Sequence, residues 1–394
     1  MVKQLTPKVY WCGKVDWDLV RFHGDEYSIK RGSSYNSYLI KDKKTVLIDT
    51  VWLPYDEEFI ANLKEAVDLK QIDYVIVNHV EVDHSGSLPR LLEEIPDVPI
   101  YCTANGARGL KAHYHKDWNI KTVKTGDTLD IGDSKLIFVE APMLHWPDTM
   151  MTYMTGENIL FSNDAFGQHY ATESLYDEPG KMADIMAEAI KYYANILTPF
   201  SPQVAKKIDE LLALNLPVSM ICTSHGVIWK NDPMKIVETY KKWANAYSED
   251  QVTIVYDTMW NSTRRMAEAI ADGIRSVDAN VTIKLFNGAK HDKNDIITEI
   301  FRSHTLVMGS STINNGILFS ISGLLEMIRG MRFKNKRAAA FGSYGWSGEA
   351  VKMINKGLEE AGFALVNEGL RINWVPDEEG LKKCFEFGRA IAKK

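Results

Sequence analysis

A short stretch near residue 80 concentrates side chains that can bind metal ions. His79, Glu81, Asp83 and His84 follow the apolar run 74–77 within "DYVIVNHVEVDHSG". The first three occupy alternate positions, so an extended backbone would point them to one side while a turn brings in the fourth. Any one of these residues alone fits a solvated polar turn, but the four together suit a metal cluster.

Three further candidate ligands stand at or just after the ends of other strand-like segments, namely His145, Asp164 and His225. Sites in α/β proteins are built where strands end at their carboxyl edge. The total of four histidines and three carboxylates, without a thiolate, exceeds the four ligands of a structural zinc site. We therefore expect two ions, with Asp164 best placed to bridge them. Imidazole and carboxylate donors suit iron or manganese as readily as zinc.

Three loops in the C-terminal part predict a flavin site. The loop 258–263, "TMWNST", leads from a strand into an amphipathic helix, whose N-terminus can bind a phosphate group. It matches neither G-x-x-x-x-G-K-[ST] nor G-x-G-x-x-G, which disfavours ATP and dinucleotides. The loops 309–317 and 341–350 combine small residues with amides, hydroxyls and aromatic rings that suit a flat ring. Each loop alone fits an ordinary capped turn, but three at neighbouring strand ends indicate a flavodoxin-like FMN site. The residues expected to contact FMN are Thr258, Met259, Trp260, Asn261, Ser262, Thr263, Ser310, Ser311, Thr312, Asn314, Asn315, Gly316, Ser343, Tyr344, Gly345, Trp346, Ser347 and Gly348.

The elements that must position these residues form two domains. Up to about residue 245, short β-rich runs alternate with polar turns and with helical patterns at 57–69 and 182–197. A polar stretch without apolar periodicity follows, so we place a boundary near residue 250 and expect domains at 1–250 and 251–394. The second domain has strand-like segments at 252–256, 281–285, 305–309, 337–341 and 364–368 that alternate with helices. This alternation predicts a doubly wound parallel sheet.

The composition excludes several classes of protein. The 394 residues are 45% hydrophobic and 25% charged, with a net charge of −6 that offers no footprint for nucleic acid. Neither a signal sequence nor a run of about 18 apolar residues occurs, so we expect no membrane insertion. The four scattered cysteines indicate no disulfide framework and favour the cytoplasm.

The motif "HVEVDH" at 79–84, with its downstream ligands, resembles the metallo-β-lactamase superfamily. Hydrolases of that superfamily ordinarily have histidine where this chain has Glu81, and the exchange is typical of the flavodiiron proteins, also called A-type flavoproteins. The loops "TMWNST", "TINNG" and "FGSYGWSGE" are similar to their flavodoxin domain, apart from Ser311 where proline is expected. The resemblance implies an α/β chain with an N-terminal metallo-β-lactamase-like αββα sandwich followed by a C-terminal flavodoxin-like doubly wound parallel sheet. It also implies one iron held by His79, Glu81 and His145, a second held by Asp83, His84 and His225, and Asp164 as the bridge.

The resemblance implies an enzyme that passes electrons through FMN to two iron ions and reduces dioxygen to water, nitric oxide to nitrous oxide, or both. The electron donor would be rubredoxin or a related small carrier, or reduced deazaflavin. It would be separate from this chain, because the chain has no paired C-x-x-C motifs. The family further implies a head-to-tail homodimer or a dimer of dimers.

Two alternatives stay open. A dinuclear zinc hydrolase fused to a flavodoxin-like electron carrier would keep the fold and change the chemistry, although Glu81 disfavours it. A pure electron carrier would not need the seven ligands, and in particular would not need Asp164 for its function. The six remaining histidines are expected at the surface or in the core, and His23 is the best of them for a role beside the ligands.

Overall fold

The computed structural model describes residues 2–392, which divide into two compact units. The first unit runs up to Tyr192 and also takes in Phe200–Ala244, and the second takes in Tyr193–Pro199 and the chain from Asn245 onwards. The predicted boundary at residue 250 lies close to this division, within strand β17 (Glu249–Asp257), and it remains a prediction.

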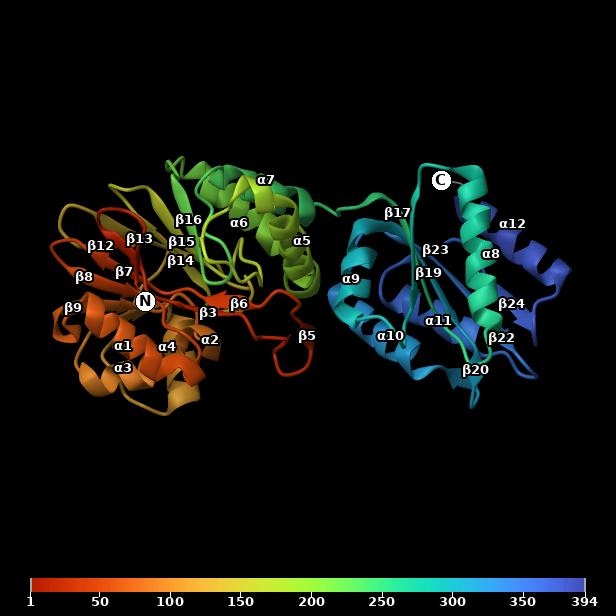
Figure 1. The fold of residues 1–394 in the computed structure, drawn as a ribbon, viewed down its shortest axis with the longest axis horizontal. Helices are drawn as coiled ribbons and strands as arrows, with labels where there is room; N and C mark the ends of the chain where they lie inside the picture. Colours follow the sequence, from red (N-terminus) through yellow and green to blue (C-terminus); the bar gives the residue numbers. More distant parts are fainter. Residues whose placement is uncertain (1, 393–394) are drawn as a thin grey trace. The chain divides into compact units, whose positions relative to one another are not determined.

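The first unit is built on two sheets that pack face to face (Figure 1). One sheet has the order β1-β2-β7-β8-β9-β10-β11 and the other has the order β12-β13-β14-β15-β16. The strands are β1 (Lys3–Gln4), β2 (Val9–Trp11), β7 (Tyr38–Lys41), β8 (Thr45–Ile48), β9 (Ile72–Ile76), β10 (Ile100–Cys102), β11 (Ile120–Thr122), β12 (Thr128–Asp130), β13 (Lys135–Glu140), β14 (Met150–Met154), β15 (Ile159–Asn163) and β16 (Met220–Thr223). Two small ribbons pair β3 (Lys14–Asp16) with β6 (Ser33–Tyr35) and β4 (Arg21–Phe22) with β5 (Tyr27–Ser28).

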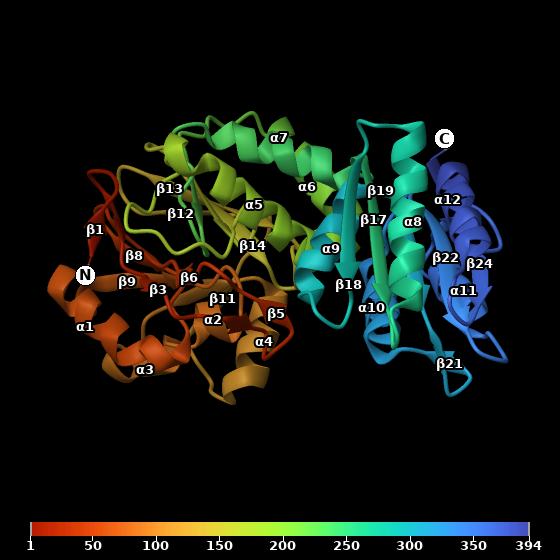
Figure 2. The ribbon, with the colours of Figure 1, turned by 45° about the vertical axis from the view of Figure 1, so that its right-hand side comes forward.

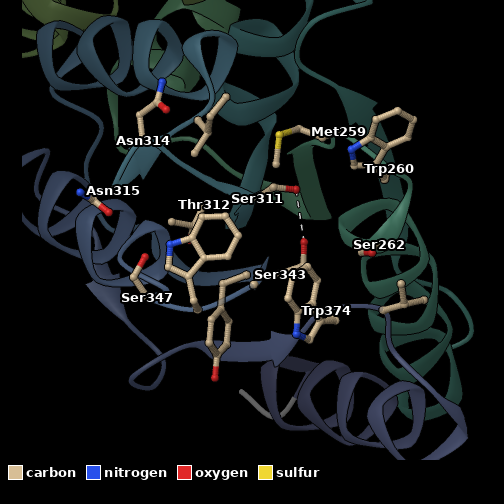
Figure 3. Close-up of a pocket in the computed structure, with 15 residues that line it drawn as sticks. Met259, Trp260, Ser262, Ser311, Thr312, Asn314, Asn315, Ser343, Ser347 and Trp374 are labelled. Atoms are coloured by element: carbon tan, nitrogen blue, oxygen red, sulfur yellow. Dashed lines mark hydrogen bonds between the residues drawn. The ribbon is translucent and has the colours of Figure 1, made fainter.

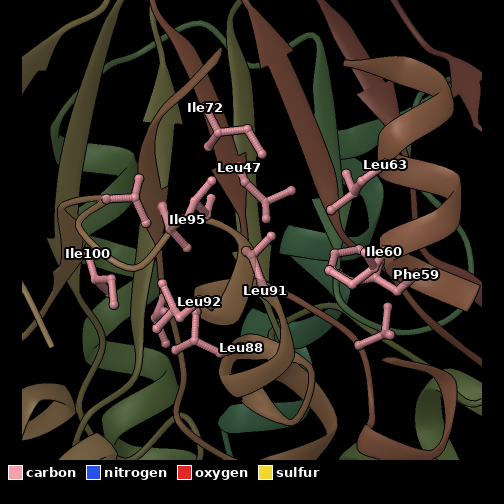
Figure 4. Packing of buried hydrophobic residues seen from close by; sticks show 14 of the residues in the cluster. Leu47, Phe59, Ile60, Leu63, Ile72, Leu88, Leu91, Leu92, Ile95 and Ile100 are labelled. Carbon is pink, nitrogen blue, oxygen red and sulfur yellow. The ribbon is translucent and has the colours of Figure 1, made fainter. Parts of the chain in front are cut away.

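Helices cover the outer face of each sheet (Figures 1 and 2). Those of the first unit are α1 (Asp56–Ala66), the short α2 (Val82–Ser85), α3 (Leu88–Glu94), α4 (Ala104–Tyr114), α5 (Met182–Tyr192), α6 (Ser201–Ala213) and α7 (Pro233–Ala244). Apolar residues at spacings of three and four give α1 one buried stripe, Phe59, Ile60 and Leu63, which packs in the same cluster as Leu47 and Ile72 of the sheet (Figure 4). The layers are helix, sheet, sheet and helix, so the predicted αββα sandwich is confirmed.

The second unit is a parallel sheet with helices on both faces. Its order is β18-β17-β19-β22-β23, and a further strand, β24, also pairs with β22. The strands are β17, β18 (Thr282–Asn287), β19 (Ser303–Ser310), β22 (Arg337–Tyr344), β23 (Ala364–Leu365) and β24 (Leu370–Asn373), with a hairpin of β20 (Thr312–Ile313) and β21 (Gly316–Ile317). The helices are α8 (Ser262–Val277), α9 (Lys293–Arg302), α10 (Phe319–Met331), α11 (Ala350–Glu360) and α12 (Glu378–Ala392). This strand order is that of the flavodoxin-like fold, which confirms the predicted doubly wound sheet.

The last predicted strand differs from the structure. Instead of one strand at 364–368, the chain forms β23 and β24, which pair with successive parts of β22. Gly369 separates them with a φ of +89°, a conformation that glycine adopts without the strain of a Cβ. The carboxyl end of this edge of the sheet therefore lies at Asn373, five residues later in the sequence than the predicted strand end.

Candidate metal centre and flavin site

The seven candidate ligands converge at one end of the two sheets of the first unit. His79 follows β9 of one sheet, while Asp164 follows β15 and His225 follows β16 of the other. His145 comes from the loop 141–149 between β13 and β14. Residues that lie far apart in the sequence thus meet because the strands that precede them end at the same edge.

The ligands form two groups. Candidate ligand atoms lie within 4.8 Å of one another in each group, one containing His79, Glu81, His145 and Asp164 and the other containing Asp83, His84 and His225. Apart from Asp164, which the family resemblance places between the groups, the division is the one that the resemblance implies, and the binding of iron by these residues remains a prediction.

Asp164 faces both groups with different oxygens. Its Oδ2 lies 3.7 Å from Nε2 of His79 and 3.5 Å from Nε2 of His145. Its Oδ1 lies 3.1 Å from Nε2 of His84 and 3.5 Å from Nε2 of His225. A carboxylate in this position can bridge two cations, one on each side.

The local backbone differs from the extended segment that the alternating pattern suggested. Helix α2 begins at Val82, and Glu81 is the residue that precedes it. Asp83 is grouped with His84, its neighbour on the helix, and not with His79 and Glu81. The turn of the helix thus divides the four candidate ligands of residues 79–84 between two sites, which an extended strand would not do.

Four of the seven candidate ligands have buried atoms that lack hydrogen-bond partners, whereas Glu81 and His145 are partly exposed. Among the described residues, Nε2 of His79 and of His84 and both carboxylate oxygens of Asp83 and of Asp164 are buried without one. Leaving such groups unsatisfied costs about 1–3 kcal/mol each, and more when they are charged. Two bound cations would satisfy all of them, so the donor set fits a dinuclear metal centre. With only imidazole and carboxylate donors, iron fits as well as zinc.

Two outer contacts fix the orientation of ligand imidazoles. His79 Nδ1 donates to Asp148 Oδ2 at 2.9 Å, and Val80 N donates to the same oxygen at 2.8 Å. His225 Nδ1 donates to the carbonyl oxygen of Ser34 at 2.7 Å. Each bond leaves Nε2 as the free ring nitrogen that faces the site, which is how proteins commonly orient metal-binding histidines.

A further buried carboxylate joins the two ligand-bearing sheets. Asp49, which follows β8, accepts hydrogen bonds from Asn78 N at 2.7 Å and from Asn78 Nδ2 at 3.1 Å. It also accepts one from Asn163 Nδ2 at 3.4 Å. Asn78 and Asn163 directly precede His79 and Asp164, so Asp49 fixes both ligand segments.

The charges of the ligands are strongly coupled. Burial lowers the pKa of His84, but the nearby Asp83 and Asp164 outweigh it and raise that pKa to about 9. Conversely, burial raises the pKa of Glu81, but close contacts with His145, His23 and His79 lower it below its ordinary range. Protons thus neutralise the acidic cluster in the absence of metal, and a cation that binds must displace them.

Two histidines that the sequence did not assign as ligands lie beside the cluster. His23 Nε2 is 3.2 Å from Glu81 Oε1, on the side of the first group. His169 packs against the ring of His225 with a centroid distance of 4.9 Å, and its Nδ1 is hydrogen-bonded to Ser33 Oγ at 2.8 Å. His23 is the histidine that the sequence analysis favoured for a position beside the ligands, whereas His169 was not distinguished from the other histidines.

The second unit has a cavity of about 570 Å³ at the carboxyl edge of its sheet (Figure 3). The lining residues come from the three predicted loops and from one more loop after β24. They are Met259, Trp260, Ser262, Ser311, Thr312, Ile313, Asn314, Asn315, Ser343, Tyr344, Gly345, Trp346, Ser347, Trp374 and Val375. In Figure 3, Asn314 and Asn315 lie on the side of the cavity opposite to Trp260 and Ser262.

Three hydroxyls join the predicted loops at the base of the cavity. Thr263 Oγ1 lies 2.9 Å from Ser311 Oγ and 3.0 Å from Ser343 Oγ, and the two serine hydroxyls are 3.2 Å apart. Ser311, the departure from the expected proline, therefore contributes a hydroxyl to this cluster. The N-terminus of α8 begins here without an acidic residue in its first turn, and Thr258 Oγ1 is buried without a partner. Backbone N–H groups, hydroxyls and a positive helix end fit the phosphate of FMN.

The sequence missed three lining residues, Ile313, Trp374 and Val375. Trp374 N donates to Tyr344 O at 2.7 Å, and the indole lies so close to Gly345 that a Cβ there would be 3.1 Å from it. Six predicted contacts do not line the cavity, and their roles remain predictions. They are Thr258, Asn261, Thr263, Ser310, Gly316 and Gly348.

Comparison with known proteins supports both halves of this description. Residues 34–226 match the family model described as ODP family beta lactamase, and residues 254–388 match that of flavodoxin. A relative from Salmonella typhi named anaerobic nitric oxide reductase flavorubredoxin is 55% identical over 388 residues, which cover 98% of this chain and 81% of the relative.

Solved structures agree over the whole chain. The structure described as rubredoxin oxygen:oxidoreductase from Desulfovibrio gigas superimposes with a TM-score of 0.96 at 34% identity, covering 100% of this chain and 98% of that one. The flavodiiron protein from Giardia intestinalis gives a TM-score of 0.94 at 34% identity, covering 100% and 97%. The chain therefore belongs to the flavodiiron proteins, enzymes that combine an FMN-binding flavodoxin domain with a di-iron domain of the metallo-β-lactamase fold.

Proposed function

We propose that this enzyme takes electrons from an external donor through FMN to its di-iron centre and reduces nitric oxide to nitrous oxide there, with dioxygen as a second substrate. The observation that carries the proposal is the position of Asp164, whose two oxygens face the two groups of candidate ligands and are themselves buried without a hydrogen-bond partner. Two metal ions held side by side can bind and reduce a small molecule, and FMN supplies electrons to them singly.

Different side chains would hold the metal ions and orient the residues that bind them. His79, Glu81 and His145 would hold one iron and Asp83, His84 and His225 the other, with Asp164 between them. Asp148 and the carbonyl of Ser34 orient two of the imidazoles. Asp83, His84, Asp164 and His225 are buried, whereas Glu81 and His145 are partly exposed.

The names of the similar proteins support a preference for nitric oxide over dioxygen. The relative named for nitric oxide reduction is 55% identical to this chain, whereas the structure named for oxygen reduction is 34% identical. Both substrates are small and nearly apolar, so the difference must lie in groups around the metals, such as His23 beside Glu81.

Rubredoxin is the electron donor that we propose, because the names flavorubredoxin and rubredoxin oxygen:oxidoreductase both contain it. Reduced deazaflavin is the alternative. We further propose a head-to-tail homodimer that brings the FMN of one subunit to the metals of its partner. No helix in residues 2–392 is long and apolar enough to cross a membrane. The four cysteines are buried and unpaired, which supports a reducing cytoplasm.

The test follows reoxidation of the reduced enzyme. Protein loaded with FMN and iron is reduced anaerobically and mixed with nitric oxide or dioxygen in a stopped-flow spectrometer, alongside an iron determination per chain. We expect two irons, faster reoxidation by nitric oxide than by dioxygen, and nitrous oxide as the product. Asp164→Ala should abolish the fast phase, whereas Asp97→Ala, which changes an exposed aspartate, should not.

The other outcomes separate the alternatives. Two zinc ions in the native protein, which have no redox role, would favour the hydrolase. Unchanged electron transfer in Asp164→Ala would favour a simple carrier. Faster reoxidation by dioxygen would reverse the proposed order of the substrates and leave the di-iron mechanism in place.

A further inference from the structure

The two candidate metal positions have ligands of the same types. The first group offers two imidazoles and one carboxylate, from His79, Glu81 and His145, and the second group offers the same from Asp83, His84 and His225, with Asp164 facing both. FMN supplies electrons singly, so turnover passes through a half-reduced centre with one iron(III) and one iron(II). Because the ligand types match, residues around the ligands decide which group holds which ion.

The outer partners of the ligand imidazoles differ in charge. His79 Nδ1 donates to Oδ2 of Asp148 at 2.9 Å, and Val80 N donates to the same oxygen at 2.8 Å. Two such bonds favour the ionised form of the carboxyl group. His225 Nδ1 instead donates to the neutral carbonyl oxygen of Ser34 at 2.7 Å. In residues 2–392, no other ligand imidazole donates to a carboxylate outside the ligand set.

A carboxylate partner makes an imidazole a stronger electron donor. It attracts the proton on Nδ1, which increases the negative charge on Nε2 and raises the basicity of the ligand. A more basic ligand stabilises iron(III) more than iron(II), because the attraction grows with the charge of the cation. The carbonyl of Ser34 carries only a partial charge, so its effect on His225 is smaller. The hydrogen bond from His79 to Asp148 therefore favours iron(III) in the first group.

The exposure of the ligands acts in the same direction. The side chains of Glu81 and His145 in the first group are 13% and 11% exposed. Those of Asp83 and His225 in the second group are 4% and 1% exposed. A buried position stabilises the extra positive charge of iron(III) less well than a position near water. Burial thus favours iron(II) in the second group.

Two other charged groups lie close enough to oppose this order. His23 Nε2 is 3.2 Å from Glu81 Oε1, and its positive charge when protonated would weaken that ligand, but the His23 side chain is 31% exposed and is screened by water. Asp49 lies near His84 of the second group, but its carboxylate accepts hydrogen bonds from two asparagine side chains and not from a ligand ring. Asp148 is 6% exposed and is bonded directly to a ligand, so its effect is the largest.

We propose that Asp148 makes the two metal positions unequal, so that the half-reduced centre holds iron(III) in the first group and iron(II) in the second. The inference rests on the proposed function. One electron from FMN converts the iron(III) of the second group to iron(II), and the next electron does the same in the first group. No bond forms or breaks in either step, and the Nδ1 proton stays on His79.

Asp148 acts on the metal only through His79, so it is a positioning residue. The competing explanation is that Asp148 only orients the ring. Asp148→Asn separates the two explanations, because the amide oxygen can accept the same hydrogen bonds without the negative charge. A role in orientation alone would survive this substitution, whereas an effect of the charge would not.

The first readout is the oxidation state of each iron, which does not depend on turnover. Crystals of the enzyme loaded with FMN and iron are poised anaerobically at the potential where the half-reduced centre gives its largest electron paramagnetic resonance signal. Anomalous diffraction across the iron absorption edge then gives the edge energy at each metal position. We expect the higher edge energy, that of iron(III), in the first group. The opposite order, or equal energies at the two positions, would overturn the inference.

The second readout compares variants in the same measurement. Asp148→Asn should keep two irons per chain, and the ratio of iron(II) in the second group to iron(II) in the first should fall about tenfold. Asp97→Asn, at an exposed position, should leave the ratio unchanged. An unchanged ratio in Asp148→Asn would overturn the role of the charge. Loss of iron from this variant would overturn it as well, since the amide should preserve the ligand positions.

Failure of this inference is distinguishable from failure of the proposed function. Equal edge energies in an enzyme that nitric oxide or dioxygen reoxidises would overturn the inference and leave the function in place. If neither gas reoxidises the enzyme, the proposed function is wrong. The edge energies of the iron-loaded protein would then still decide whether Asp148 makes the two positions unequal.

Discussion

Removal of the Asp148 side chain should weaken metal binding without altering any ligand. Its Oδ2 accepts hydrogen bonds from His79 Nδ1 and Val80 N, and both partners are buried. Although burial raises the pKa of Asp148, the hydrogen bond and the charge of His79 lower it below the ordinary value, so the carboxylate is ionised. Asp148→Ala leaves two buried N–H groups unsatisfied and lets the His79 imidazole rotate.

Outer partners of this kind contribute about 10–100-fold to metal affinity. At about 1.4 kcal/mol per tenfold, this is ~1.4–2.8 kcal/mol of binding free energy. Asp148→Asn should lose less, because the amide oxygen can accept the same two hydrogen bonds without the charge. The assay is anaerobic titration of the metal-free protein with iron(II) against a competing chelator, with Asp97→Asn, at an exposed position, as the control. Equal affinity of Asp148→Ala and unmodified protein would refute the reasoning.

Three further predictions concern the second unit. Thr263→Val removes the hydroxyl that lies within 3.0 Å of Ser311 and Ser343, so FMN should bind about tenfold more weakly, which flavin fluorescence titration of the flavin-free protein measures. Trp374→Ala should also weaken FMN binding and increase the fluorescence of any flavin that remains bound, because it removes an aromatic wall of the cavity, and unchanged fluorescence would contradict contact between them. Burial lowers the pKa of Lys336 from 10.5 to about 7. Between these values the unfolded chain binds more protons than the folded one, so Lys336 should make the free energy of unfolding rise with pH, by on the order of 2 kcal/mol from pH 7 to 9. Urea unfolding of Lys336→Met should lack that rise, and an equal rise in both proteins would contradict the expectation.

The candidate ligands could be identified from the sequence because residue type and strand position carry most of the information, and their binding of iron remains a prediction. His79, Asp164 and His225 each follow a buried β-run that the alternation of apolar and polar residues reveals. Their division into two groups was not predictable from spacing, since it depends on α2 beginning at Val82. Four residues are too few to show a helical period, and only the family resemblance indicated the grouping.

The supporting residues were beyond sequence reasoning for a different reason. Asp148 lies in the loop that also carries His145, and nothing in its surroundings distinguishes it from a solvated loop carboxylate. Its partner is 69 positions earlier in the sequence. Such contacts depend on how the two sheets pack against each other, and no short stretch of the sequence shows that packing.

Trp374, which lines the flavin cavity, was not predicted because the last strand was placed too early in the sequence. The apolar pattern placed the last strand at 364–368, whereas the strand that ends beside the cavity is β24. Asn373 secures the following turn, because its Nδ2 donates to Gly345 O at 2.8 Å. Had the break at Gly369 been recognised as a turn between two strands, the rule that sites lie at strand ends would have included Trp374.

Asp49 explains how a centre assembled from two sheets can keep its geometry. Asn78 lies at the end of a strand of one sheet and Asn163 at the end of a strand of the other, and the same carboxylate accepts hydrogen bonds from both. Burial raises the pKa of Asp49 even though it lies near the positive charge of His84. A buried carboxylate is unfavourable unless such bonds satisfy it, so their geometry is strongly constrained. The ligands that follow each asparagine, His79 and Asp164, are therefore held at a fixed separation by the protein itself, and a bound metal ion does not have to impose that separation.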